Sequence, residues 1–186
     1  MTDSLSSASV RRAAAVAADY EALQGLINVS TGLGLAVVVL GQPALGAVVI
    51  GLGTAFGSLW YRRRFGRAPA RRSTAAVLGC VLAGAFVLLA ALALDNLLDW
   101  PVLFFPLASA GFLAAAYRLG YARFGVTRWH WAVAGLVALC SLLPLLGVGR
   151  TSAGSTWVLL FAAALVVIGA IDHVRLVRAM RPVPRD

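Results

Sequence analysis

The chain has 186 residues, of which 61% are hydrophobic and only 12% are charged. Soluble domains contain about half apolar and about a quarter charged residues, so this composition excludes an ordinary water-soluble fold. All sixteen basic residues are arginine, and the formal net charge is +9. The composition therefore predicts an all-α, polytopic membrane protein with a strongly basic surface.

Six apolar stretches follow one another with short connections, and each approaches the length of about 20 residues that crosses a bilayer as a helix. We expect them to form three helical hairpins in one transmembrane domain, residues 23–173. A cytoplasmic amphipathic segment, 1–22, precedes this domain, and a basic tail, 174–186, follows it. The predicted spans are Leu23 to Leu40, Pro43 to Tyr61, Thr74 to Leu94, Pro101 to Tyr117, Trp131 to Val148 and Thr156 to Ile171.

Arginine is distributed unequally between alternate connections. With these spans, fifteen arginines fall on one side and only Arg150 falls on the other. The positive-inside rule then places both termini in the cytoplasm and the loops at 41–42, 95–100 and 149–155 outside. Arginine without lysine, together with abundant Ala, Gly and Val, suggests a GC-rich bacterial genome. We therefore expect a multi-pass protein of a bacterial plasma membrane.

The N-terminal segment has no apolar run close behind Met1, so we expect the first span to direct insertion without a cleavable signal peptide. A polar stripe then enters that span on one helical face, formed by Glu21, Gln24, Asn28 and Thr31 at steps of three, four and three. The stripe has two interpretations. It is favoured as a seam of hydrogen bonds between helices, and a water-accessible groove is the alternative.

The connection after the second span carries six arginines and no carboxylate: Arg62, Arg63, Arg64, Arg67, Arg71 and Arg72. We expect these residues to contact anionic lipid headgroups or an acidic membrane or cytosolic protein, whereas nucleic acid is not expected as a partner. The sequence Tyr-Arg-Arg-Arg-Phe-Gly at 61–66 is echoed by Tyr-Ala-Arg-Phe-Gly at 121–125. Common ancestry of the hairpins and chance both explain so short a match.

Small residues and prolines inside the spans predict how the helices pack. Gly53 and Gly57 lie on one face of the second span, where they permit close approach of another helix. This approach fits packing within the bundle and homo-oligomer formation equally well. Pro106 and Pro144 are expected to kink the fourth and fifth spans, chiefly for packing.

Chemistry-bearing residues are scarce. His130, Asp172 and His173 fall at the cytoplasmic border, but a metal site built from them is disfavoured, and Asp172 is expected to pair with an arginine. The sequence has no catalytic, metal-binding or nucleotide-binding motif, and no ionisable residue near the middle of a span. We therefore expect no cofactor, no metal and no catalytic residues.

These observations leave three hypotheses. The favoured one is a small non-enzymatic membrane subunit that binds a partner as an accessory or regulatory protein, because chemistry is absent while a large basic surface is present. The second is a transporter or channel for an uncharged or amphipathic substrate, which would leave no charged residue inside the membrane. The third is a membrane-embedded enzyme.

Overall fold

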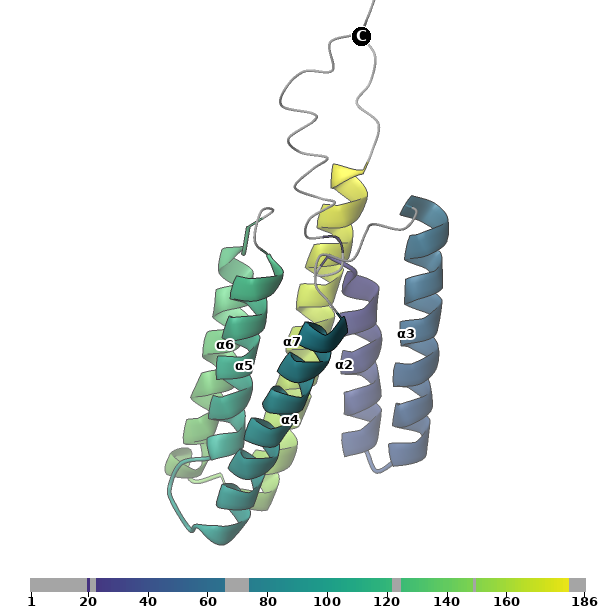
Figure 1. Cartoon of the computed structure of the whole chain (residues 1–186). Helices are drawn as coiled ribbons and strands as arrows, with labels where there is room; N and C mark the ends of the chain where they lie inside the picture. The colour runs from purple at the N-terminus through teal and green to yellow at the C-terminus, as the bar shows by residue number, and fades with distance from the viewer. Residues whose placement is uncertain (1–19, 21–22, 66–73, 122–124, 149, 181–186) are drawn as a thin grey trace, which may run out of the picture.

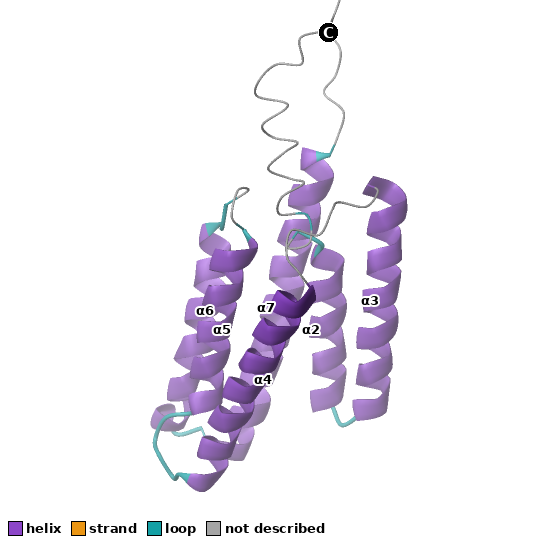
Figure 2. Ribbon diagram, in the orientation of Figure 1, coloured by secondary structure: helices purple, strands orange, loops and turns teal. Residues whose placement is uncertain are grey.

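A computed structural model describes residues 20, 23–65, 74–121, 125–148 and 150–180 of the chain. Within these residues the protein is helical and has no strand (Figure 2). The prediction of an all-α fold is confirmed. The elements are α2 (Gly25–Val39), α3 (Pro43–Phe65), α4 (Thr74–Leu97), α5 (Phe104–Gly120), α6 (Arg128–Leu139), the 3-10 helix η1 (Cys140–Leu146) and α7 (Arg150–Ala179).

Among the residues that the structure describes, three helical segments are long and apolar enough to cross a membrane: Pro43–Phe65, Arg128–Leu146 and Ser155–Ala179. Helix α2, Gly25–Val39, is apolar but shorter, and residues 82–97 of α4 are apolar as well. Every span expected from the sequence falls on a helix. Crossing of the membrane by all six helices remains a prediction, as does the orientation of the chain.

The helices run side by side, with α7 between two groups (Figure 1). On one side α2 packs along α7 and α3 packs on α2, while on the other side α5 and α6 pack together and α6 contacts α7. Helix α4 packs on α5. Consecutive helices therefore do pair, as expected of hairpins, but the extensive contact between α2 and α7 joins the first and last helices of the described chain.

Glycines make the contact of α2 with its neighbours close. A Cβ at Gly25 would collide with the backbone carbonyl of Gly169, and a Cβ at Gly32 would lie 2.5 Å from the carbonyl oxygen of Ala162. On the other face of α2, a Cβ at Gly53 of α3 would collide with Ser30. The packing role predicted for Gly53 is confirmed, and its partner is α2 of the same chain.

The connections depend on residues that leave the ordinary backbone regions. Gly41, with φ of +86°, makes the turn between α2 and α3, and Pro43 occupies the first position of α3, where a missing N–H costs nothing. The Asp95 carboxylate caps α5 by accepting the backbone N–H groups of Phe104 at 2.6 Å and Phe105 at 2.8 Å. A carboxylate is favourable there because the N-terminus of a helix carries a partial positive charge.

The structure corrects the expectations for Pro106 and for the last outer loop, whereas Pro144 does alter its helix as expected. Pro106 does not interrupt a helix, because α5 begins at Phe104 and a proline in the first turn displaces no hydrogen bond. Pro144 does change the helix, since residues 140–146 around it are 3-10 rather than α. The expected outer loop at 149–155 is helical from Arg150. The break between the two helices lies earlier, at Gly147, whose φ is +80°, and α7 contains no proline that would interrupt it.

Large apolar side chains point outward from α3 and α4. Phe56 and Leu52 are 71% and 68% exposed on α3, and Phe86 is 74% exposed on α4. Buried side chains gather instead around Tyr61, Tyr117 and Leu176. An apolar exterior with aromatic and polar groups inside is the arrangement expected of helices surrounded by lipid.

Candidate functional site

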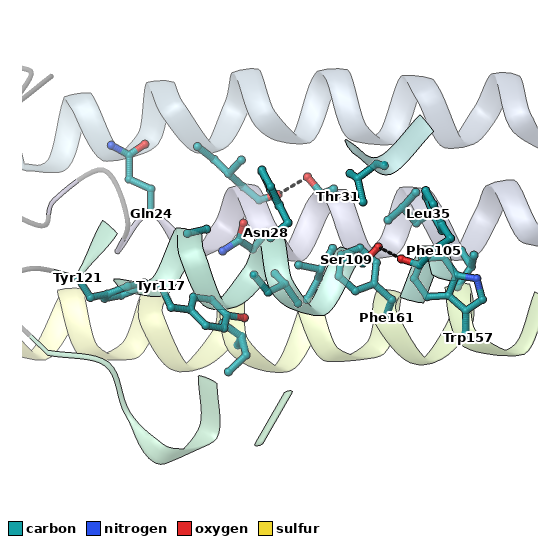
Figure 3. A pocket seen from close by; sticks show the side chains of 18 residues that line it. Gln24, Asn28, Thr31, Leu35, Phe105, Ser109, Tyr117, Tyr121, Trp157 and Phe161 are labelled. Carbon is teal, nitrogen blue, oxygen red and sulfur yellow. Dashed lines mark hydrogen bonds between the residues drawn. The ribbon is translucent and has the colours of Figure 1, made fainter. Parts of the chain in front are cut away.

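A cavity of about 590 Å³ lies between α2, α5 and α7, and Leu88 of α4 contributes to its wall (Figure 3). Cavities of this size commonly hold a small organic molecule. Its lining comprises Gln24, Ile27, Asn28, Thr31, Leu35, Leu88, Phe105, Ser109, Phe112, Leu113, Ala116, Tyr117, Tyr121, Trp157, Val158, Phe161, Leu165 and Ile168.

Each of the three helices lines the cavity with a regular face. Helix α5 and the residue that follows it contribute side chains spaced by four: Phe105, Ser109, Leu113, Tyr117 and Tyr121. Residues at this spacing lie on one side of a helix. In α7 the same spacing brings Trp157, Phe161 and Leu165 to the cavity. The cavity is therefore elongated and runs along three helices.

The lining changes from polar to apolar along the length of the cavity. Gln24 and Tyr121 lie at one end, and Asn28 and Tyr117 follow (Figure 3). The other end is formed by Leu35 and by a row of three rings, in which Trp157 lies 5.1 Å from Phe105 and 5.7 Å from Phe161. The cavity is thus amphipathic.

Tyr117 carries the least usual polar group in this lining. Its side chain is 6% exposed, and its hydroxyl has no hydrogen-bond partner among the described residues. Leaving a buried hydroxyl unpaired costs about 1–3 kcal/mol, so such groups usually have a partner in a working protein. The ring itself is held edge-on by His130, with ring centroids 4.8 Å apart.

The other hydroxyls of the cavity are already engaged. Thr31 Oγ1 donates to the Ile27 carbonyl at 2.8 Å, and Ser109 Oγ donates to the Phe105 carbonyl at 2.8 Å. Each bond stays within one helix, so neither residue joins two helices. These hydroxyl oxygens retain the capacity to accept a hydrogen bond from a guest.

The predicted polar stripe bears directly on the cavity. Gln24, Asn28 and Thr31 all line it, whereas Glu21 falls outside the described residues. Among the described residues, no side-chain hydrogen bond joins Gln24, Asn28 or Thr31 to another helix. The hydroxyl of Thr31 bonds within α2. Whether the stripe forms a seam between helices or a water-accessible groove stays a prediction.

Beside the cavity lies a buried polar cluster, which we define as Tyr121, Thr127, His130, Asp172 and Arg175. Asp172 and His130 are both fully buried and their Oδ2 and Nε2 atoms are 3.2 Å apart. Tyr121 donates its hydroxyl to Asp172 Oδ2 at 2.5 Å. Burial and the Asp172 carboxylate raise the pKa of Tyr121 above its ordinary value of 10.0.

Further contacts complete this cluster. Arg175 donates to Asp172 Oδ1 at 3.3 Å and to the Gly125 carbonyl at 2.9 Å, so the predicted pairing of Asp172 with an arginine is confirmed. Thr127 Oγ1 lies 2.7 Å from Nδ1 of His130. A neutral His130 with its hydrogen on Nε2 fits both contacts, donating to Asp172 and accepting from Thr127.

His173 lies apart from this cluster. Its Nδ1 is 2.8 Å from the hydroxyl of Tyr61, which also accepts the backbone N–H of Leu26 at 3.1 Å. The two histidines considered as metal ligands thus have separate partners. Among the described residues, no group of three or more His, Cys, Asp or Glu side chains is arranged to hold a metal ion.

The predicted basic surface is described in part. Arg62, Arg63 and Arg64 form the last turn of α3 and are exposed, while Arg67, Arg71 and Arg72 fall outside the described residues. The end of α3 lies at the same end of the bundle as the C-termini of α5 and α7 (Figure 1).

Sequence reasoning missed the α5 and α7 walls of the cavity. Tyr117, Tyr121 and Trp157 are not among the site residues predicted from the sequence. The spacing of four from Phe105 to Tyr121 was a signal for a shared face, but apolar spans contain many such spacings. Only the packing of α5 opposite α2 distinguishes this face from one turned toward lipid.

Comparisons with known proteins assign no function to the site. No protein-family model matches the chain, and comparisons with curated proteins and with solved structures give no match. The site is therefore interpreted from its cavity, its buried polar groups and the charge of its lining.

Proposed function

We propose that this protein is an integral membrane carrier that binds an uncharged amphipathic molecule between α2, α5 and α7. The observation that carries the proposal is the cavity of about 590 Å³ itself, which has Gln24 and Asn28 toward one end and the rings of Phe105, Trp157 and Phe161 at the other. The proposal adopts the second of the three hypotheses drawn from the sequence, the transporter, in place of the partner-binding subunit that was favoured there.

The proposal includes six membrane-crossing helices with both termini in the cytoplasm. The arginine-bearing end of α3 and the C-termini of α5 and α7 share one end of the bundle, and the turn between α2 and α3 lies at the other (Figure 1). This arrangement supports the orientation inferred from the positive-inside rule.

Cysteine labelling in intact cells tests the orientation. In a chain with Cys80 and Cys140 replaced by alanine, single cysteines at the exposed positions Gln42 and Asn96 should react with an impermeant thiol reagent. A cysteine at Met180, at the end of α7, should react only after the cells are opened. Labelling of Met180→Cys in intact cells would overturn the orientation.

A cavity-filling experiment tests the carrier. The purified protein in nanodiscs is photolabelled with an aliphatic diazirine, and the labelled residues are mapped by mass spectrometry. We expect saturable labelling of the α5 and α7 walls. Ser109→Leu and Ala116→Leu should each reduce it severalfold, since both positions line the cavity. Ala132→Leu, at an exposed position of α6, is the matched control and should leave labelling unchanged.

The outcome of that experiment separates a binding site from bulk lipid. Labelling that rises linearly with probe concentration, or that is equal in the filled variants and the control, would show that the cavity holds only surrounding lipid chains. Two filling variants are used so that a folding defect in one leaves the other informative. Transport itself is then measured by efflux of the same probe from proteoliposomes.

A partner-binding subunit remains the second candidate, favoured by the exposed Arg62, Arg63 and Arg64. Each basic residue near an anionic membrane surface contributes about 1 kcal/mol of attraction. Replacing the three by glutamine should weaken association with anionic vesicles or with an acidic partner in a pull-down from membranes. Unchanged association in a correctly inserted variant would remove this candidate.

A further inference from the structure

Exposure within the cavity lining indicates the side from which a guest arrives. Of the eighteen residues that line the cavity, only Phe112 and Ala116 are exposed. We propose that the guest is a molecule dissolved in the bilayer, and that it enters sideways between α2 and α5, past a door formed by α4. This inference rests on the proposed carrier function and adds the source of the guest and its route.

The two exposed residues mark the mouth of the cavity. Phe112 is 44% exposed, whereas Leu113, the next residue of α5, is 8% exposed. Ala116 follows Phe112 by one helical turn, so the two side chains share one edge of α5. The cavity therefore reaches the surface of the bundle along this edge, while the buried row from Ser109 to Tyr117 forms its back wall.

Buried groups stand at the other sides of the cavity. Glycines bring α2 and α7 into contact along one side. At the polar end, Tyr121 lies in a buried cluster with Leu23. At the aromatic end, Trp157 lies in a second buried cluster with Leu103. Among the described residues, the mouth is thus the exposed approach to the cavity.

The mouth lies at the depth of the hydrocarbon core. Phe112 is the middle residue of α5, about 12 Å from either end of that helix at about 1.5 Å per residue. Thr31, which lines the cavity from α2, is next to the middle residue of α2. The middle of a helix that crosses the membrane is surrounded by lipid chains, not by water. A molecule that enters here therefore comes from the bilayer.

Helix α4 stands at the mouth. A Cβ on Gly84 of α4 would lie 2.4 Å from the ring of Phe112, and Leu88, one turn later, lines the cavity. Among the described residues, α4 packs on α5 and has no extensive contact with α2. Its side chains Phe86 and Leu89 are exposed. A helix that is packed on one side only can move away from the mouth with the loss of few contacts, as a door requires.

The side chains around the mouth select the chemistry of the guest. Leu35, Leu88, Phe112 and Ala116 are apolar and line this part of the cavity. An ionised group that passes them at the middle of the membrane gives up its water and meets no counter-charge, which is costly. The guest is therefore uncharged in the form that enters, and it dissolves in the bilayer before it binds.

Bridging the mouth tests the route. In a chain with Cys80 and Cys140 replaced by alanine, Leu35→Cys and Leu88→Cys are joined by a short bifunctional methanethiosulfonate, and the protein is studied in nanodiscs. The probe is decanol that carries a diazirine. A bridge formed before the probe is added should reduce saturable labelling of the α5 and α7 walls severalfold. A bridge formed after loading should trap the probe, so that labelling survives a chase with excess unlabelled decanol.

The same double variant treated with a monofunctional methanethiosulfonate is the matched control, because both cysteines are modified and no bridge forms. This control should lose its probe in the chase, and a reductant that opens the bridge should release the trapped probe. The pair Leu35→Cys and Phe112→Cys is bridged in parallel, so that a bridge that fills the cavity in one pair leaves the other informative.

Failure of both pairs to trap the probe would overturn the inference, because the guest would then leave through an end of the cavity. Equal labelling of bridged and control proteins, whichever order is used, would overturn it for the same reason. Absence of saturable labelling in the protein without these cysteines overturns the carrier proposal itself, which keeps the two failures distinct.

Discussion

The two sides of α7 are held by different chemistry at neighbouring residues. On one side, Tyr61 at the end of α3 bonds to His173, and on the other, Tyr121 after α5 bonds to Asp172. The first contact is neutral and accompanies glycine-mediated packing of α2 on α7. The second belongs to a buried cluster containing a carboxylate. One helix thus joins a close-packed side to a side held by polar contacts, and the cavity lies between them.

This difference explains where the cavity is. Close approach of α2 and α7 at Gly25 and Gly169 leaves no space between those helices. Helix α5 meets α7 across the larger rings of Phe105, Trp157 and Phe161, which hold it farther from α2. The cavity therefore depends on both sides, since glycines draw one wall inward and aromatic side chains keep the opposite wall away.

The largest expected effect comes from removing the carboxylate of the polar side. Asp172→Ala leaves His130 and Tyr121 buried without their partner, and breaking a buried pair costs about 3–5 kcal/mol. His173→Ala, one residue along α7, should cost less, about 1–3 kcal/mol, because the Tyr61 hydroxyl loses its acceptor but keeps the N–H of Leu26. Chemical unfolding of the detergent-solubilised variants measures both losses. Equal losses would contradict the distinction between the two sides.

A smaller effect is expected on the close-packed side. Gly25→Ala places a Cβ against the backbone of Gly169, and overpacking of this kind costs about 1–3 kcal/mol. Gly135→Ala in α6 is the matched control, since a Cβ there has open space and alanine favours a helix by about 0.5–1 kcal/mol. The same unfolding measurement should show a loss for the first variant and a small gain for the second. A loss in both would mean that helix distortion, not contact with α7, limits stability.

The sequence predicts the elements of this fold better than their partners. Apolar length locates every described helix, and Gly53 correctly marks a packing face. Helices α2 and α7 approach each other closely at Gly25 and Gly169. The sequence around each glycine does not indicate that the other is its partner. The same limit applies to the site: the stripe at Gln24, Asn28 and Thr31 was predicted as polar, but a groove and a seam differ only in what stands opposite. What stands opposite the stripe is a wall formed by α5 and α7, and the sequence of α2 does not identify that partner.

The last expected effect is a change of stability at alkaline pH, and it separates Tyr121 from the rest of its side. The pKa of Tyr121 is raised in the folded protein, so between about pH 10 and that higher value the folded state holds a proton that the unfolded state has lost. The stability contributed by this group is complete below about pH 10 and falls above it, by up to about 1.4 kcal/mol per pH unit.

At neutral pH, Tyr121→Phe should be less stable than the unmodified protein by about 1.5–3 kcal/mol, the value of a hydrogen bond to a charged group. Because phenylalanine does not titrate, the difference between the two proteins should shrink as the pH rises from about 9 to about 11. The remaining tyrosines titrate in both proteins and cancel in the comparison. A difference that stays constant over this range would mean that the Tyr121 proton is not held by Asp172 and that the polar side derives its stability from His130 and Arg175 alone.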